Sequence, residues 1–299
     1  QILIVGAGFG GMWTALSATR LFDLHGHKEV EVTVLAPQAE LRVRPRFYEP
    51  DAHRLVAPIG ELFDAVGVKF IKGAVDTIDA QQKRVGYIDA SGTRQVCCYD
   101  KLVLATGSRL AVPDTQGVAQ YAFDVDQIEH AVRLEQHLKS LADLPQSQGR
   151  NTVVVAGGGF TGIETATEMP ARLRAILGAD ANVEVIIVDR GEKLGASMGA
   201  EISQSIAEAS DELGVTWRLK SSVVAVDEQG VTLGDGQRID AKTVVWTTGV
   251  RACALTAQIP GERDSLGRLH VDAHLKVIGQ NDIFATGDVA YAATDDLGN

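Results

Sequence analysis

Gly-Ala-Gly-Phe-Gly-Gly at residues 6–11 and Gly-Gly-Gly-Phe-Thr-Gly at residues 157–162 are the two stretches that decide the fold. Each follows a short apolar run and opens a segment of helical character. A strand, a glycine-rich turn and a helix in this order are typical of the βαβ unit that binds a dinucleotide, because glycine lets a pyrophosphate approach the helix N-terminus. One such stretch is a weak signal, since glycine turns also serve ordinary packing. Two in matching contexts predict two dinucleotide sites.

The sequence around the turns completes two βαβ units. In the first unit, residues 2–5 predict a central parallel strand, residues 12–21 a helix and residues 30–35 a second strand. In the second unit, residues 152–156 and 183–189 predict the two strands. Proline 170 predicts a kink or an early end of the helix that follows the second turn.

Each half also carries strand-like segments suited to a small antiparallel sheet. In the first half these are residues 69–75, 83–89 and 95–103. In the second half they are residues 222–226, 230–233 and 243–247, with a hairpin turn at Asp235-Gly236. Both halves then close on a Thr-Gly pair, at residues 106–107 and 248–249.

The order of these segments predicts how the chain is divided. A helix expected at residues 126–141 and a polar stretch at residues 145–149 separate the halves, and residues 283–288 indicate that the chain crosses back to the first domain. We therefore predict an α/β fold of two Rossmann-like domains, each with a parallel central sheet and a small antiparallel sheet. The expected domains are a discontinuous FAD-binding domain at 1–115 and 266–299 and an inserted NAD(P)H-binding domain at 116–265.

Composition limits the classes of function. The 299 residues suffice for two domains, and 45% of them are hydrophobic. A net charge of −11 disfavours a nucleic-acid partner and provides no basic belt for anionic lipid. No apolar run approaches the roughly 20 residues that span a bilayer. The three cysteines predict no disulfide framework and fit a reducing cytoplasm. The seven histidines suggest no metal site, because they lack companions at ligand spacing.

The residue that ends the second strand of each βαβ unit discriminates between ligands. A carboxylate there accepts hydrogen bonds from ribose hydroxyls and repels a 2′-phosphate. In the second unit this residue is Asp189, which favours NADH over NADPH, although the adjacent Arg190 could tolerate a phosphate. An exposed strand-end acid is the alternative interpretation. In the first unit the position is Ala36, so the usual carboxylate is missing, and Gln38 or Glu40 could replace it.

The motif Phe-Ala-Thr-Gly-Asp at residues 284–288, together with both turns and both Thr-Gly pairs, gives the chain a family resemblance. It resembles the flavoproteins with two dinucleotide-binding domains, the pyridine nucleotide-disulfide oxidoreductase superfamily. Within that group, residues 157–164 and 244–252 are most similar to the type II NADH dehydrogenases, which reduce quinones. Residues 44–49 are similar to the family segment that passes the flavin.

The resemblance implies roles for particular residues. Asp288 would bind the flavin ribityl chain, and Thr106 and Gly107 would contact the flavin through their backbone. Glu164 would lie near nicotinamide and flavin as the catalytic residue, orienting the carboxamide or relaying a proton; a carboxylate placed there by the helix dipole is the alternative. Glu168 would share its helical face. The expected cofactor-binding residues are Gly6, Gly8, Phe9, Gly10, Gly11, Ala36, Pro37, Gln38, Arg44, Pro45, Val75, Thr106, Gly107, Gly157, Gly159, Phe160, Thr161, Gly162, Asp189, Arg190, Thr248, Gly249, Gly287 and Asp288.

Two dinucleotide sites and this resemblance predict a FAD-dependent oxidoreductase that transfers a hydride from NADH to FAD and on to a quinone-type acceptor. Two alternatives stay open. One is a soluble NADH-dependent reductase of a ferredoxin or similar carrier, and the other is a low-turnover flavoprotein that senses NADH. The family continues into a C-terminal domain absent from this chain. The resemblance therefore implies a homodimer and a cytoplasmic protein with peripheral contact to the cytoplasmic face of the membrane through that part.

Overall fold

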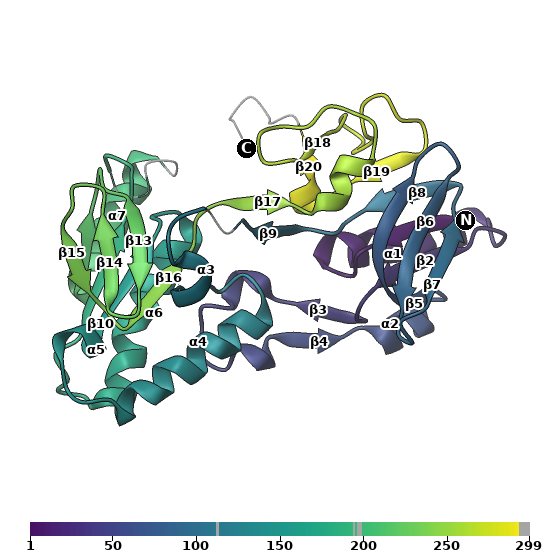
Figure 1. Ribbon diagram of the computed structural model, residues 1–299. Helices are drawn as coiled ribbons and strands as arrows, with labels where there is room; N and C mark the ends of the chain where they lie inside the picture. The colour runs from purple at the N-terminus through teal and green to yellow at the C-terminus, as the bar shows by residue number, and fades with distance from the viewer. Residues whose placement is uncertain (112–113, 194, 196–198, 293–299) are drawn as a thin grey trace. The chain divides into compact units, whose positions relative to one another are not determined.

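The computed structural model describes residues 1–111, 114–193, 195 and 199–292 (Figure 1). The chain divides into two compact units. The first consists of Gln1–Arg42, Val56–Arg109 and Val250–Asn299, and the second of Val43–Leu55 and Leu110–Gly249. These boundaries differ from the expected ones in three places. Residues 250–265 belong to the first unit, the segment 43–55 belongs to the second, and the second unit begins at Leu110 rather than at residue 116.

A seven-stranded sheet in the order β19-β8-β1-β2-β5-β6-β7 forms the centre of the first unit. Its neighbouring strands β19, β8, β1, β2 and the first part of β5 run parallel, whereas β5, β6 and β7 pair antiparallel. The bounds are β1 Ile2–Val5, β2 Val32–Ala36, β5 Lys69–Asp79, β6 Arg84–Asp89, β7 Arg94–Cys98, β8 Lys101–Leu104 and β19 Ile283–Ala285. One long strand, β5, thus joins the parallel sheet to the antiparallel hairpins.

Helices and short strand pairs complete the first unit. Helix α1 (Phe9–His25) packs against β1 and β2, and α2 (Gly60–Ala65) packs against β5. The short strands form the pairs β3 (Glu40–Arg42) with β4 (Val56–Pro58), β9 (Ser108–Leu110) with β17 (Val250–Ala252), and β18 (Leu269–His270) with β20 (Ala290–Tyr291). Two 3₁₀ turns are η5 (Ala254–Gln258) and η6 (Gly287–Val289).

The prediction of a single strand at residues 95–103 is wrong, because this segment contains parts of two strands. Strand β7 ends at Cys98 at the edge of the sheet, and β8 begins at Lys101 between β1 and β19. The two connecting residues make bonds outside both strands: the Tyr99 N–H donates to the Lys83 oxygen at 3.1 Å, and the Asp100 N–H donates to the Gln1 oxygen at 2.9 Å. Asp100 and Lys101 are poor strand formers, so the local sequence carried a signal for this break that the prediction of one strand overlooked.

The second unit is built on a four-stranded parallel sheet in the order β12-β11-β10-β16. Its strands are β10 Thr152–Ala156, β11 Glu184–Val188, β12 Val215–Arg218 and β16 Thr243–Trp246. A small antiparallel sheet contains β13 Val223–Asp227, β14 Gly230–Leu233 and β15 Arg238–Asp240. The helices are α3 Val118–Tyr121, α4 Ile128–Ser140, α5 Gln148–Asn151, α6 Phe160–Leu177 and α7 Ala200–Leu213, with 3₁₀ turns η1 Arg44–Arg46, η2 Ala52–Arg54 and η3 Leu141–Asp143.

The parallel strands bury side chains on both of their faces, as their continuous apolar sequences predict. In β10, Val153 and Val155 enter an apolar cluster with residues of α4 and α6, whereas Val154 and Ala156 enter a second cluster with residues of β13 and β14. Strand β1 divides its side chains between two clusters in the same way. The α/β fold class with parallel central sheets is confirmed.

Helix α6 does not end early at Pro170 but continues to Leu177. An interior proline costs about 3 kcal/mol, because it removes one helical hydrogen bond and its ring crowds the preceding turn. The buried face of the helix offsets this cost. Met169 and Leu173 are both 0% exposed, and burying one such side chain contributes about 1.5–3 kcal/mol.

Leu173→Ala should lower the free energy of unfolding by about 2–5 kcal/mol, because it leaves a cavity in the core between α6 and β10. Leu213→Ala is the matched control on α7, where the side chain is 42% exposed, and it should cost less than about 1 kcal/mol. Urea unfolding followed by circular dichroism measures both. Equal losses in the two variants would contradict the placement of Leu173.

Candidate functional site

The two glycine turns have the same backbone geometry in their separate units. Gly6 has φ +110° and Gly157 has φ +119°, a region that favours glycine. A Cβ atom on Gly6 would lie 2.3 Å from the Ala105 oxygen, and one on Gly157 would lie 2.3 Å from Cγ2 of Thr248. Both positions therefore require glycine. Its positive φ lets the backbone turn, and the absence of a side chain lets the segment around the Thr-Gly pair lie close to the turn.

The last glycine of each turn allows the helix to approach the strand. A Cβ atom on Gly11 would lie 1.9 Å from the Gly6 oxygen, and one on Gly162 would lie 1.9 Å from the Gly157 oxygen. No side chain fits at these distances. Gly11 and Gly162 therefore serve the packing of α1 and α6 onto the turns, and this requirement exists whether or not a ligand binds.

The middle glycine of each turn has a different environment. Gly8 and Gly159 are the N-caps of α1 and α6, both are exposed, and a Cβ atom on either would meet nothing within 4 Å. No side chain caps either helix. Since the first N–H groups of a helix need partners, the open space in front of each helix fits an anionic group such as a pyrophosphate.

At the first turn, three segments meet at the carboxyl edge of neighbouring strands. Strands β1, β8 and β19 lie side by side and lead into residues 6–11, 105–108 and 286–288. Ser108 Oγ donates to Oδ2 of Asp288 at 2.6 Å. The Thr106 hydroxyl oxygen is buried and has no hydrogen-bond partner within the described chain. A buried hydroxyl without a partner is costly, so this edge of the sheet has a polar group that a ligand could satisfy.

The strand ends next to this edge hold the other expected residues of the first unit. Ala36 is 3% exposed and presents only its backbone, while Pro37 and Gln38 are exposed. Glu40 lies on β3, where its carboxylate is 3.6 Å from the Arg42 guanidinium. Val75 follows the β5 residues that pair with β2, and its side chain packs against the core.

Asp189 lies beside the second glycine turn and makes two hydrogen bonds there. Its Oδ2 accepts from the Gly158 N–H and its Oδ1 accepts from the Gly191 N–H, both at 2.7 Å. The carboxylate thus ties the turn to the loop after β11, a role that sequence reasoning missed. Arg190 is exposed, as are Phe160 and Thr161 at the start of α6, and Thr248 and Gly249 follow the neighbouring strand β16.

Arg44 and Pro45 lie in η1, within the second unit. The Arg44 guanidinium forms an ion pair with the Asp126 carboxylate, and its Nε donates to the Asp126 backbone oxygen at 3.1 Å. Asp126 also accepts from the Leu110 N–H at 3.0 Å and from the Gln127 side chain at 2.8 Å. Arg44 therefore helps to fasten the segment 43–55 to the residues that precede α4.

Glu164 lies on the first turns of α6 and is partly buried. Burial raises the pKa of its carboxyl, and the negative charge of Glu49 raises that pKa further. Glu168 and Arg172 follow at intervals of four residues, which places all three on one face of the helix. Arg172 is 8% exposed. Sequence reasoning missed Arg172, although helical periodicity places it on the same apolar face as Met169.

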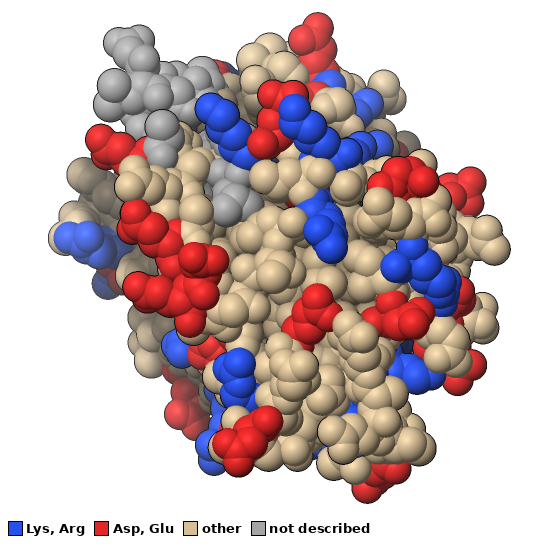
Figure 2. Space-filling view, turned by 90° about the vertical axis from the view of Figure 1, so that its left-hand side faces the viewer, with Lys and Arg blue, Asp and Glu red and all other residues tan. Residues whose placement is uncertain are grey.

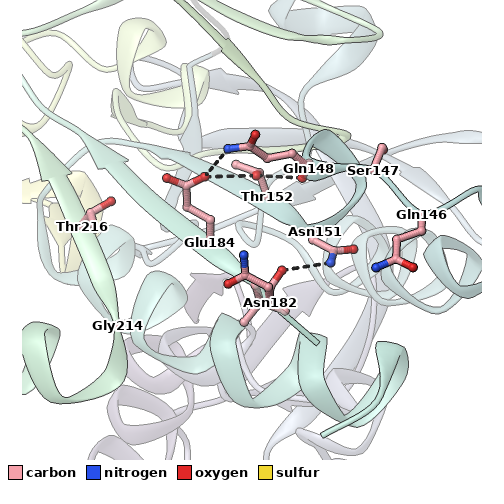
Figure 3. Close-up of a pocket in the computed structure, with 10 residues that line it drawn as sticks. Gln146, Ser147, Gln148, Asn151, Thr152, Asn182, Glu184, Gly214 and Thr216 are labelled. Atoms are coloured by element: carbon pink, nitrogen blue, oxygen red, sulfur yellow. Dashed lines mark hydrogen bonds between the residues drawn. The ribbon is translucent and has the colours of Figure 1, made fainter. Parts of the chain in front are cut away.

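Two further features lie away from the glycine turns. A hollow of about 630 Å³ opens at the amino ends of β10, β11 and β12, where the Glu184 carboxylate accepts from Gln148 at 3.3 Å (Figure 3). The turn at residues 157–162 lies at the opposite, carboxyl edge of this sheet. Ligating atoms of Asp51, His53 and Glu135 lie within 4.8 Å of one another. Lys139 Nζ lies 2.5 Å from Oε1 of Glu135, so an ammonium group already pairs with one of the two carboxylates.

The surface charges and the helices of the described residues agree with two expectations from the sequence, that the chain has no basic belt and no membrane-spanning segment. On the face drawn in Figure 2, lysine and arginine side chains are interspersed with aspartate and glutamate. Of the helices in the described ranges, none has both the length and the apolar character needed to cross a bilayer.

Comparison with known proteins identifies the family. The model of the pyridine nucleotide-disulphide oxidoreductase family matches residues 1–297, and the chain belongs to this family of oxidoreductases. It is 42% identical over 302 residues to an NADH dehydrogenase-like protein of Mycobacterium tuberculosis, covering 99% of this chain and 74% of that protein. It is 28% identical to the type II NADH:quinone oxidoreductase of Staphylococcus haemolyticus, covering 97% of this chain and 74% of the relative.

The fold is similar to that of a solved relative. The structure of NDH2 from Plasmodium falciparum in complex with NADH superimposes with a TM-score of 0.82 at 19% identity, covering 97% of this chain and 64% of that chain. At this identity the likeness shows the fold alone. The family resemblance inferred from the sequence motifs is confirmed.

The environments of the glycines predict that two similar substitutions will act differently. Gly159→Ala should leave the melting temperature almost unchanged and weaken dinucleotide binding, because the added methyl group enters the open space before α6. Gly162→Ala should lower the melting temperature by several degrees, because its methyl group meets the Gly157 oxygen. Thermal unfolding and NADH titration measure the two effects. Loss of stability in both variants would show that the space at Gly159 is not open.

Proposed function

We propose that the protein is a FAD-dependent NADH dehydrogenase that transfers a hydride from NADH to FAD and passes the electrons to a quinone-type acceptor. The first unit would bind FAD and the second NADH. The observation that carries this proposal is the pair of glycine turns, each with a required glycine at its first and last positions and open space at its middle glycine. Two such turns in one chain provide for two dinucleotides.

The residues of the first unit fit FAD. The uncapped start of α1 can donate N–H groups to a pyrophosphate at Gly8, and the Thr106 hydroxyl has no other partner among the described residues. Asp288 and Ser108 add hydrogen-bonding groups at the same edge of the sheet. Ala36 offers no carboxylate, so the adenosine ribose would be held by the exposed loop at Pro37 and Gln38 or by backbone groups.

The residues of the second unit fit NADH. The uncapped start of α6 at Gly159 would hold the pyrophosphate, and Asp189 would accept hydrogen bonds from the ribose hydroxyls. Its carboxylate oxygens retain lone pairs beyond the two N–H groups that they accept. When both cofactors are bound, the flavin supplies the two-electron acceptor, and the protein holds the reactants and excludes water. We assign Glu164 to hold or give a proton near them, since its raised pKa keeps it protonated to higher pH than an ordinary glutamate.

The acceptor and the partners are inferred from the relatives. The chain spans 64% of the length of the solved NDH2 and 74% of its sequence relatives, so the activity of the whole protein is a proposal. The name of the staphylococcal relative indicates a quinone acceptor. We further propose a homodimer with peripheral contact to the cytoplasmic face of the membrane, and no nucleic-acid partner.

Asp189→Asn should reduce the preference for NADH over NADPH by about tenfold or more, because the negative charge that repels a 2′-phosphate is removed. The side-chain oxygen of asparagine can still accept one of the two backbone hydrogen bonds. The ratio of kcat/KM for the two nucleotides measures the effect, with Arg190→Gln as the control for the neighbouring charge. An unchanged ratio in Asp189→Asn would exclude Asp189 as the discriminating residue.

Anaerobic addition of NADH to the purified protein should bleach the visible flavin absorbance, because hydride transfer reduces the flavin. A subsequent addition of a short-chain quinone should restore the absorbance rapidly. A colourless protein that cannot be reconstituted with FAD would overturn the proposal. Rapid reoxidation by an iron–sulfur carrier with none by the quinone would favour a carrier reductase, and a reduced state that both acceptors fail to reoxidise would favour a sensor.

A further inference from the structure

The loop after β12 lies against the loop that carries Asp189, and both belong to the second unit. The Asp189 N–H donates to the Arg218 oxygen, and the Ser221 N–H donates to the Asp189 oxygen, both at 3.0 Å. The Lys220 N–H donates to the Gly191 oxygen at 2.9 Å. These backbone bonds place Lys220 beside the proposed ribose partner, although the two residues are far apart in the sequence.

Asp189 connects this pair of loops to the second glycine turn. One of its carboxylate oxygens accepts from the Gly158 N–H, and the other accepts from the Gly191 N–H. A Cβ atom on Gly191 would lie 2.7 Å from Oδ1 of Asp189, so no side chain fits between them. Direct contacts therefore lead from the glycine turn through Asp189 and Gly191 to Lys220. A ribose that bonds to Asp189 would carry its 2′ position to these loops.

The side chain of Lys220 is paired with a carboxylate from the neighbouring loop. Its Nζ lies 3.0 Å from Oε1 of Glu192, and the two side chains are 67% and 78% exposed. An exposed ion pair contributes little to stability, because water screens it. Lysine has a flexible four-carbon stem, so its ammonium group can exchange one nearby anion for another. While the pair is formed, however, the ammonium group already has a partner.

We propose that Glu192 is a second residue that determines the preference for NADH over NADPH, because it pairs with Lys220 and keeps this cation from a 2′-phosphate. Glu192 acts through Lys220 and is therefore a positioning residue, whereas Asp189 acts on the ribose directly. The inference rests on the proposed function in one respect, namely that the second unit binds its nucleotide at Asp189.

Glu192→Gln removes the charge and keeps the size of the side chain. NADP⁺ and NAD⁺ are titrated calorimetrically into the FAD-loaded protein, since these oxidised nucleotides have the adenosine ends of NADPH and NADH but do not reduce the flavin. The variant should bind NADP⁺ about three- to fivefold more tightly, because the released ammonium group pairs with the 2′-phosphate. Its affinity for NAD⁺, which has no 2′-phosphate, should be unchanged.

Glu228→Gln is the matched control. It removes an exposed carboxylate from the turn between β13 and β14 of the same unit, and it should leave both affinities unchanged. No gain in NADP⁺ affinity in Glu192→Gln, or an equal gain in the control, overturns the proposal.

A second pair of variants tests whether the gain passes through Lys220. In a Lys220→Gln background, Glu192→Gln should change the affinity for NADP⁺ by less than about twofold, because no ammonium group is left to release and salt screens the remaining charges. An equal gain with and without Lys220 would mean that Glu192 only repels the phosphate, and it would contradict the proposed pairing.

The same titrations separate this inference from the proposed function. If neither nucleotide binds to the wild-type protein, both fail. If NAD⁺ binds and the ratio of the two affinities is the same in Glu192→Gln as in the wild type, only the inference about Glu192 fails. A parallel loss of both affinities in Glu192→Gln would show that Glu192 merely supports the loop, and it would also overturn a role in specificity.

Discussion

The close approach of a helix to a strand-end turn is the constraint on which both units depend. With 1.9 Å between a built Cβ atom at Gly11 or Gly162 and the oxygen of the first glycine of its turn, nothing larger than hydrogen fits. This contact aims the N-termini of α1 and α6 at the carboxyl edges of their sheets. The space at Gly8 and Gly159 is open, and neither helix start has a capping side chain. The first N–H groups of both helices are therefore left to solvent or to a ligand.

The parallel sheets bring further polar residues to the edge at which each glycine turn lies. In the first unit, β8 and β19 flank the turn on one side, and they bring Thr106 and Asp288 to the same edge although they are far apart in sequence. In the second unit, β11 does the same for Asp189, whose carboxylate then stabilises the turn itself. Asp189 is therefore both a structural acceptor and the proposed ribose partner, and substitutions that remove both bonds at once confound the two roles.

The sequence predicted the parts of this arrangement that depend on local pattern. The continuous apolar runs at residues 2–5 and 152–156 predicted central strands, since such runs must be buried on both faces. The glycine spacing predicted the turns, and Asp235-Gly236 predicted a hairpin after β14. The partner in that hairpin is β15, however, and the expected partner at residues 243–247 is β16, which pairs in parallel with β10. The new pairing partners that the chain takes after Tyr99 and the continuation of α6 through Pro170 were not predictable in this way. Both depend on neighbours distant in sequence, which decide the pairing of one segment and offset the proline of the other.

The segment 43–55, which belongs to the second unit, shows most clearly what local pattern omits. Residues 44–49 resembled a family segment, but nothing in that stretch reveals that Arg172 and Glu135, more than 80 residues away, hold its backbone. The available signal lay in the helices, where the apolar period of α6 includes an arginine and that of α4 includes a glutamate. A charge at a buried helical position needs a partner, and a backbone group of a neighbouring segment is one of the few that can supply it. A buried charge next to buried apolar positions of a helix, such as Arg172 beside Met169 and Leu173, therefore predicts that a neighbouring segment supplies a backbone partner there.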